Sequence, residues 1–404
     1  MAVGLSDNPQ FLPIRGVKLA ACSAAIYKKQ RPDLAIIACD RGSTAAAVFT
    51  RNAFCAAPVL VAREHIAKTQ PLYLLINAGN ANAGMGNKGI SDARLLCKKL
   101  ALLGGCREEA VLPFSTGVIG EPLPVDKMCY MLPQLLPALS DDKWLDVARA
   151  IMTTDTVAKG ISRQISIGDQ VITITGIVKG AGMIRPDMAT VLAFIATDAA
   201  VDPGILRGIL GEAVEESFNR VSVDGDTSTN DACVLLATGR AGTGGNIRGS
   251  AVDTFREAIR EVCIYLAQAI VRDGEGATKF VTLEICGGNS QAECRNVAYA
   301  IAHSPLVKTA LYASDPNWGR ILAAIGRAGI QDLDVNSIRI CIDDIPLFAK
   351  GGRSQDYSEA AGRAVFMKPE IKLHIDLGRG PAKYVYWTCD LSHEYVRINA
   401  EYRS

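Results

Sequence analysis

The stretch that most constrains the fold is KGAGMIRPDMATVLAFIATD, Lys179 to Asp198. It joins a glycine-rich turn at Gly180 and Gly182, a short polar loop, and a nearly unbroken apolar run from Val191 to Ala196. This run is too short for a buried helix and is bounded by turn residues, so it predicts a strand covered on both faces. Thr190 is therefore expected directly before the first residue of a core strand.

The local pattern leaves two interpretations of Thr190 open. Threonine is common at the start of strands, and this is the more frequent explanation. The second is chemical: beside the small Ala189, a threonine hydroxyl in a tight turn can attack the carbonyl of its own preceding peptide bond, and water then cleaves the ester. The new chain would begin with a threonine whose α-amine, of intrinsic pKa about 7.7–8.0, can serve as base for its own hydroxyl.

Charge and length limit the function classes. The chain has 404 residues, which predicts two or three domains with a large buried core. Its 43 lysines and arginines nearly balance 42 aspartates and glutamates. Because no basic surplus exists to neutralise phosphates, nucleic acid and anionic membranes are poor partners, and a small molecule is the expected ligand.

The first residues, MAVGLSDNPQFLPIRG, do not have the pattern of a secretory signal, and no apolar run reaches the roughly 18 residues that span a bilayer. A soluble cytoplasmic protein is expected. The 12 cysteines are scattered from Cys22 to Cys389 without a C-x-x-C pair. This pattern predicts reduced thiols in apolar surroundings and no metal site.

Two loops could bind ligands or merely turn the chain. Gly84 to Gly89 matches G-x-G-x-x-G, but it does not follow a strand directly, as a dinucleotide site requires. We expect a turn-rich loop before a helix from Ser91 to Leu103, and a nucleotide-binding module is the non-enzymatic alternative. Ser115 to Gly120, STGVIG, follows a predicted strand, and its backbone N–H groups could hold an oxyanion or form a turn.

Acidic residues mark two further places. SVDGDTSTND, Ser222 to Asp231, carries three acids but lacks the spacing of an EF-hand, so we expect a hydrogen-bonded loop lining a pocket. Glu275 lies between two glycines at a predicted helix end. Exposed carbonyls there disfavour a negative charge, so a purely structural role is less natural.

The C-terminal part of the chain has a different hydrophobic pattern. Apolar residues alternate with period two, as in Val281 to Ile285 and Ile371 to Leu377. This pattern predicts a smaller α+β domain with an antiparallel sheet. The domains are placed at residues 1–280 and 281–404.

Two helices are predicted there, because Ser304-Pro305 and Asp315-Pro316 each place a proline at a first helical position after a polar residue. The tail HEYVRINAEYRS is short and polar, but we expect it to dock through four apolar or aromatic residues: Tyr395, Val396, Ile398 and Tyr402.

Several motifs, in order along the whole chain, resemble those of the ornithine acetyltransferases. This family is also called the bifunctional glutamate N-acetyltransferase and amino-acid acetyltransferase of arginine biosynthesis. The motifs are STGVIG at 115–120, KGAGMIRPDMATVLAFIATDA at 179–199, SVDGDTSTND at 222–231, DGEGATKF at 273–280, SDPNWGRI at 314–321 and NAEYRS at 399–404.

The resemblance implies an α/β, two-domain ornithine-acetyltransferase-type fold. A layered α/β self-processing core, similar to N-terminal-nucleophile hydrolases, would carry a smaller α+β C-terminal domain. The family implies autocatalytic cleavage between Ala189 and Thr190, giving an α chain of residues 1–189 and a β chain of residues 190–404. The assembly implied is a heterotetramer of two α and two β chains.

The resemblance also implies roles for single residues. Thr190 would be the nucleophile, and Thr116 with the Gly117 N–H would form the oxyanion hole. The residues implied in substrate binding are Thr153, Lys179, Thr190, Glu275, Asn399 and Ser404. Lys179 can meet a substrate carboxylate and Glu275 an amino group.

The implied reaction is ping-pong acetyl transfer from N2-acetylornithine to glutamate, with no cofactor and no metal. Use of acetyl-CoA as a further acetyl donor is left open. A self-processing aminopeptidase or amidase, in which water replaces glutamate, is the alternative enzyme.

Overall fold

The computed structural model describes residues 2–27, 31–185, 191–242 and 245–401. The chain forms two compact units. The larger unit contains Ser6–Asn219 and Thr227–Ile270. The smaller unit combines three segments that are far apart in the sequence: Met1–Leu5, Arg220–Asp226 and Val271–Ser404.

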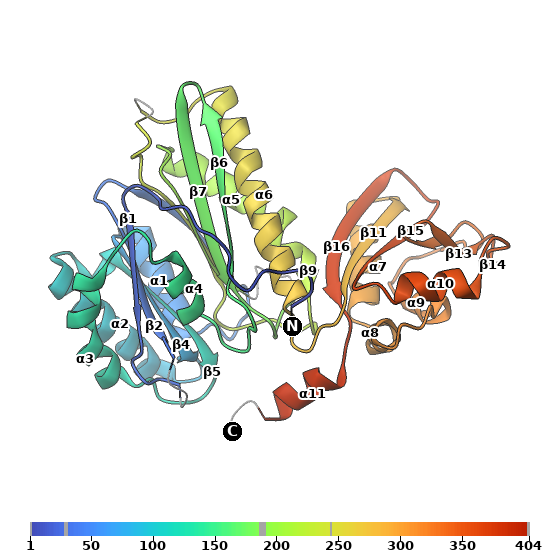
Figure 1. Cartoon of the computed structure of the whole chain (residues 1–404), viewed down its shortest axis with the longest axis horizontal. Helices are drawn as coiled ribbons and strands as arrows, with labels where there is room; N and C mark the ends of the chain where they lie inside the picture. Colours follow the sequence, from blue (N-terminus) through green and yellow to red (C-terminus); the bar gives the residue numbers. More distant parts are fainter. Residues whose placement is uncertain (1, 28–30, 186–190, 243–244, 402–404) are drawn as a thin grey trace. The chain divides into compact units, whose positions relative to one another are not determined.

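Two sheets form the centre of the larger unit (Figure 1). The first has the order β1-β2-β4-β5, with bounds β1 Val17–Cys22, β2 Leu34–Cys39, β4 Tyr73–Asn80 and β5 Val111–Val118. The second has the order β3-β10-β8-β7-β6, with bounds β3 Thr44–Phe49, β10 Ala232–Ala237, β8 Leu192–Thr197, β7 Gln170–Lys179 and β6 Lys159–Ile167.

Along the chain, the helices of this unit lie between the strands, and the last helix follows β10. The α-helices are α1 Ala57–Lys68, α2 Gly86–Gly104, α3 Val125–Leu135, α4 Trp144–Ala150, α5 Pro203–Glu216 and α6 Ser250–Arg272. Short 3-10 helices are η1 Glu108–Ala110, η2 Leu136–Ala138 and η3 Phe218–Arg220. The helix α2 begins earlier than the predicted Ser91 because Gly86 to Gly89 already belong to its first turn.

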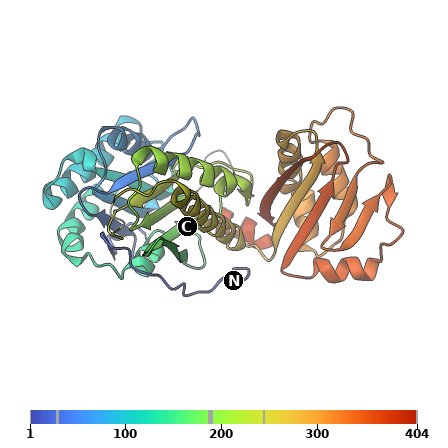
Figure 2. The ribbon, with the colours of Figure 1, turned by 90° about the horizontal axis from the view of Figure 1, so that it is seen from above.

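The two sheets pack face to face through one apolar core, which includes side chains of α4. Phe114 of β5 meets Phe194 of β8 edge to face, with ring centroids 5.1 Å apart. The other face of the first sheet is covered by α2 and α3. The outer face of the second sheet packs on α6 (Figure 2). Leu266 and Val262 of α6 lie against Gly176 of β7.

This arrangement gives a layered α/β unit, as expected. Every residue of β8 is buried, and the strand pairs with β7 antiparallel and with β10 parallel. The prediction of a core strand directly after Thr190 is therefore confirmed.

The smaller unit contains a seven-stranded sheet of order β14-β13-β12-β15-β11-β16-β9. Its strands are β9 Val221–Ser222, β11 Phe280–Gly288, β12 Arg339–Ile342, β13 Ile345–Ala349, β14 Gly352–Arg353, β15 Glu370–Asp376 and β16 Ala382–Cys389. Its helices are α7 Gln291–Ala302, α8 Pro305–Tyr312, α9 Trp318–Gly326, α10 Glu359–Phe366 and α11 His393–Ala400.

The alternation predicted for this sheet is confirmed in β15, where Ile371, Leu373 and Ile375 are buried. The prediction of an antiparallel sheet is confirmed for β11 with β16 and for β12 with β13 and β15, but it is wrong for β11 with β15 and for β16 with β9, which pair in parallel. A parallel pair needs a long crossover connection, and the segment between β11 and β15, which contains α7 to α10 and β12 to β14, is long enough to provide it.

Of the two helix starts predicted at prolines, one is confirmed and one is wrong. Pro305 begins α8, and Ser304 caps it by accepting a hydrogen bond from the Val307 amide. Pro316 does not begin a helix, because α9 starts at Trp318 and Asn317 provides the capping side chain. In the described residues, no helix is long and apolar enough to cross a membrane.

Candidate active site

The carboxyl end of β5 carries Thr116 and Gly117. Parallel pairing sets Gly117 beside Gly79 of β4, with a backbone φ of 131° at Gly117. A Cβ atom at this position would lie 2.3 Å from the Gly79 carbonyl carbon and 2.6 Å from the Asn80 amide nitrogen. Both the positive φ and the close approach therefore require glycine here.

Lys179 ends β7 and reaches the same place. It pairs across the sheet with Leu192, the first residue of β8. Its Nζ donates a hydrogen bond to the Thr116 hydroxyl over 3.3 Å, and both residues are buried. An ammonium group thus lies at the end of β5 and beside the start of β8.

Asp155 is a buried acid that no sequence pattern singled out. It accepts hydrogen bonds from the Thr153 amide at 2.8 Å, the Gly180 amide at 2.7 Å and Lys159 Nζ at 2.6 Å. Burial alone raises the pKa of Asp155, but the charges of Lys159 and Lys179 and the hydrogen bonds outweigh burial and hold the pKa below its ordinary value. Asp155 is therefore a charged carboxylate, and its hydrogen bonds hold the turn that follows Lys179.

In the sequence, only the family resemblance drew attention to this segment, through Thr153. The available signal was the i, i+4 spacing of Asp155 and Lys159 around the apolar pair Val157 and Ala158. Thr153 lies close to this carboxylate, and its hydroxyl is 3.4 Å from the same Asp155 oxygen.

The polar loop at Ser222 to Asp231 is divided between the two units after Asp226. In the larger unit, Asn230 donates to the carbonyl oxygens of Ser115 and Ala81, at 2.9 and 2.6 Å. The expectation of a hydrogen-bonded loop is confirmed for this half. Asn230 thereby holds the backbone directly before Thr116.

Glu275 and Asn399 meet in the smaller unit. The Asn399 amide donates to Glu275 Oε2 at 2.6 Å, and Glu275 is buried. Tyr395 donates to Asp224 at 3.3 Å. The expected docking of the tail by apolar surface is wrong for Val396, which is 64% exposed, because α11 is attached through these polar contacts.

Ala189, Thr190, Ser404 and Tyr402 lie outside the described residues. Among the described residues, no group of three or more histidine, cysteine, aspartate or glutamate side chains is arranged to hold a metal ion.

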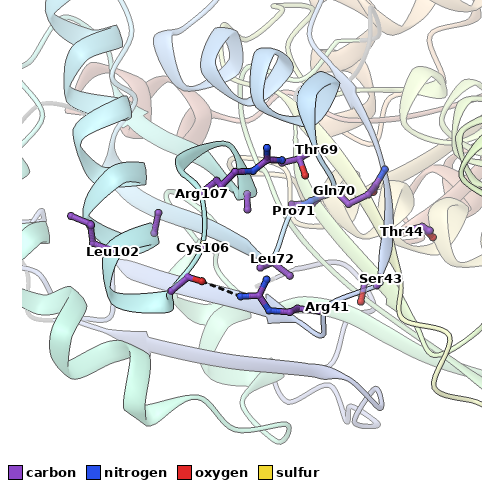
Figure 3. Close-up of a pocket in the computed structure, with 14 residues that line it drawn as sticks. Arg41, Ser43, Thr44, Thr69, Gln70, Pro71, Leu72, Leu102, Cys106 and Arg107 are labelled. Atoms are coloured by element: carbon purple, nitrogen blue, oxygen red, sulfur yellow. Dashed lines mark hydrogen bonds between the residues drawn. The ribbon is translucent and has the colours of Figure 1, made fainter.

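A separate surface pocket of about 770 Å³ lies at the opposite end of β5 (Figure 3). Leu72, before β4, and Ala110, before β5, contribute to its wall. Its cationic groups are Arg41, which donates to the Gly105 carbonyl at 3.0 Å, and Arg107. The polar cluster of Thr116 and Lys179 belongs to the other end of the strand, so the pocket is not part of it.

A family model described as the ArgJ family matches residues 18–404. The chain belongs to the ArgJ family. The expected resemblance is thereby confirmed, and with it the family's two-domain α/β fold.

Relatives from the ArgJ family match over their full length. The "Arginine biosynthesis bifunctional protein ArgJ" of Pseudomonas syringae pv. tomato is 52% identical, covering 100% of both chains. The protein of the same name from Methylococcus capsulatus is 54% identical, covering 99% of this chain and 98% of its own. A crystal structure of the ArgJ protein from Bacillus halodurans is 39% identical, covers 50% of this chain and 95% of its own, and has a TM-score of 0.48.

Proposed function

We propose that the protein transfers an acetyl group from N2-acetylornithine to glutamate, giving ornithine and N-acetylglutamate in arginine biosynthesis. The observation that carries this proposal is the full-length identity of 52–54% with relatives named as bifunctional proteins of arginine biosynthesis. The polar cluster at the end of β5 supports it, because an acyl transfer needs donors at a developing oxyanion.

The nucleophile in this proposal is Thr190, released by self-cleavage after Ala189. Cleavage gives chains 1–189 and 190–404, and the new α-amine of Thr190 takes the proton of its own hydroxyl. The hydroxyl oxygen then attacks the acetyl carbonyl of N2-acetylornithine. Ornithine leaves, and the amine of glutamate attacks the acetyl ester to regenerate the hydroxyl.

The Thr116 hydroxyl and the Gly117 N–H stabilise the tetrahedral oxyanion. The contact of Lys179 Nζ with Thr116 supports this role, because a nearby positive charge makes the hydroxyl a better donor. Lys179 also receives the substrate carboxylate, and Thr153 contributes beside it, with its amide bound to Asp155. Glu275, with Asn399 and Ser404, receives an amino group of the substrate.

The reaction as proposed needs neither a cofactor nor a metal, and acetyl-CoA as a second acetyl donor would make the protein bifunctional like its named relatives. The proposed assembly is a heterotetramer of two α and two β chains, and the proposed location is the cytoplasm. A self-processing aminopeptidase or amidase is the second candidate. Acetyl transfer from N2-acetylornithine to glutamate, measured beside release of free acetate, separates the two.

Replacing Thr190 tests the proposal. The wild-type protein should give two bands on a denaturing gel, since 189 of 404 residues in 43.0 kDa correspond to about 20 kDa and the rest to about 23 kDa. Thr190→Ala should give one band and no transfer, because it lacks the hydroxyl.

Thr190→Ser is the matched control, because it keeps a hydroxyl at the same place and should still be cleaved. Wild-type transfer by Thr190→Ala would refute the assignment. Mass spectrometry of the wild-type protein mixed with N2-acetylornithine should find one acetyl group on the chain that begins at residue 190.

A further inference from the structure

The loop between α6 and β11 carries Glu275, and a buried aspartate holds this loop from outside. Asp390 directly follows β16 and is only 2% exposed. Its Oδ1 accepts hydrogen bonds from the Thr278 amide at 2.8 Å and the Lys279 amide at 3.0 Å, and its Oδ2 accepts one from the Thr278 hydroxyl. One carboxylate therefore joins the end of the loop to the segment that leads from β16 to α11.

Ser392 holds the same loop directly beside Glu275. Ser392 is the N-cap residue of α11, but its side chain makes no capping hydrogen bond. Its hydroxyl donates instead to the Gly276 carbonyl at 2.7 Å. A serine at an N-cap ordinarily stabilises the helix that follows, so here the side chain stabilises the loop in place of the helix.

The residues on both sides of Glu275 are glycines, Gly274 and Gly276. Gly276 has a φ of 70°, and a Cβ atom there would lie 2.5 Å from the Ser392 hydroxyl oxygen and 2.7 Å from the Tyr395 amide nitrogen. This close contact requires glycine. Because glycine is also the most flexible residue, contacts from outside the loop have to fix the direction in which Glu275 points.

The carboxylate of Glu275 lies where a cation is favoured. The residue is 7% exposed, and its Oε2 accepts a hydrogen bond from the uncharged Asn399 amide at 2.6 Å. Burial raises the pKa of Tyr395. Three nearby acids raise this pKa further: Asp224, Glu275 and Asp226. Negative charge thus gathers around Tyr395, where a substrate ammonium can form charge-assisted hydrogen bonds.

We propose that Asp390 is a positioning residue that orients Glu275, and that Glu275 held in this way selects acetyl donors with an amine at the end of the side chain. This inference rests on the proposed function, in which Glu275 receives an amino group of the substrate. In N2-acetylornithine the α-amine carries the acetyl group, so the side-chain amine is the one that is a free cation. Asp390 acts through the loop, because its hydrogen bonds to the backbone after Glu275 preorganise the carboxylate before the substrate arrives.

Two acetyl donors test the proposal. N2-acetylnorvaline has the carbon chain of N2-acetylornithine without the side-chain amine, and selectivity is the ratio of kcat/KM for the two donors with glutamate as acceptor. Asp390→Ala should lower kcat/KM for N2-acetylornithine by about 10–100-fold, the effect of one hydrogen bond to a charged group, and leave that for N2-acetylnorvaline nearly unchanged. Glu275→Gln should lose at least as much selectivity, because it removes the charge itself. Acetylation of the protein, followed by mass spectrometry, gives the same ratio where turnover is slow.

Asp390→Asn separates positioning from charge. Asparagine keeps an oxygen that accepts from the Thr278 and Lys279 amides, and its NH2 group can donate to the Thr278 hydroxyl, so selectivity should stay close to that of the wild type. Asp343→Ala is the matched control. Asp343 belongs to the same unit and also accepts from a backbone amide, that of Lys372 at 3.0 Å, but it lies in the turn between β12 and β13. Its replacement should lower Tm without changing selectivity.

Ser392→Ala is a second, milder test, because it removes only the hydrogen bond to Gly276. It should lower selectivity in the same direction by a smaller factor. If Asp390→Ala does not fold, Ser392→Ala decides, and wild-type selectivity of that variant would overturn the proposal.

A folded Asp390→Ala protein with wild-type selectivity, or with an equal loss for both donors, would also overturn the proposal. So would a wild-type protein that uses both donors equally well. Failure of the wild type to take an acetyl group from N2-acetylornithine would instead refute the proposed function.

Discussion

Gly117→Ala is expected to impair both self-cleavage and acetyl transfer severely. The new methyl group would lie 2.3 Å from the Gly79 carbonyl carbon, and β4 and β5 would have to separate at that point. The φ of 131° is also unfavourable for alanine. Because the Gly117 N–H is the proposed oxyanion donor, a shift of this strand end should lower kcat by about 10²–10³-fold or more.

Gly120→Ala is the matched control for this prediction. Gly120 has a positive φ of 83°, but a Cβ there would meet no atom within 4 Å. It tests backbone strain without the collision and should cost about 1 kcal/mol of stability, with kcat nearly unchanged. Both variants are assayed for acetyl transfer and for the two bands of the cleaved protein. Equal activity of the two variants would show that the close approach to β4 is unimportant.

Asp155→Asn is expected to give the largest loss of stability. The substitution removes a buried carboxylate and breaks its ion pair with the buried ammonium of Lys159. Breaking a buried ion pair from one side costs roughly 3–5 kcal/mol. Denaturant unfolding of an uncleaved background such as Thr190→Ala measures this loss without the complication of two chains.

The pH dependence of the free energy of unfolding shows whether Asp155 stabilises the fold as a charged carboxylate. The folded pKa of Asp155 is depressed, so the stability that it contributes is present above its unfolded pKa, about 3.9, and is lost as pH falls towards the folded pKa. The difference between the wild type and Asp155→Asn should therefore be full at pH 7 and shrink in acid.

Asp92→Asn is the control, because Asp92 is a buried acid whose lysine partner, Lys88, is exposed. Its replacement leaves a charge that water can solvate, so the cost should be much smaller. If Asp92→Asn lost as much stability as Asp155→Asn, burial of the acid, and not burial of its lysine partner, would determine the loss in free energy of unfolding.

The strand that follows Thr190 could be predicted from the sequence because its signal is local. Six apolar residues between turn residues can satisfy their backbone groups only within a sheet, and β8 is buried throughout. The same holds for Ser304-Pro305, where the cap and the first helical residue are adjacent in the chain. The direction of β15 relative to β11 depends on the length of the crossover, and the period of two carries no information about direction.

The sequence by itself determined the family, the buried strand after Thr190 and the residue types of the proposed chemistry, because these depend on adjacent residues or on ordered motifs. Tertiary structure alone decided that Lys179 contacts Thr116 and that Asp155 holds Thr153, Lys159 and Gly180 together. It alone joined Ala232, the first residue of β10, to the Val191 carbonyl by a backbone hydrogen bond. These groups become neighbours only when separate strands align, and the burial that sets their charges exists only after the sheets have packed.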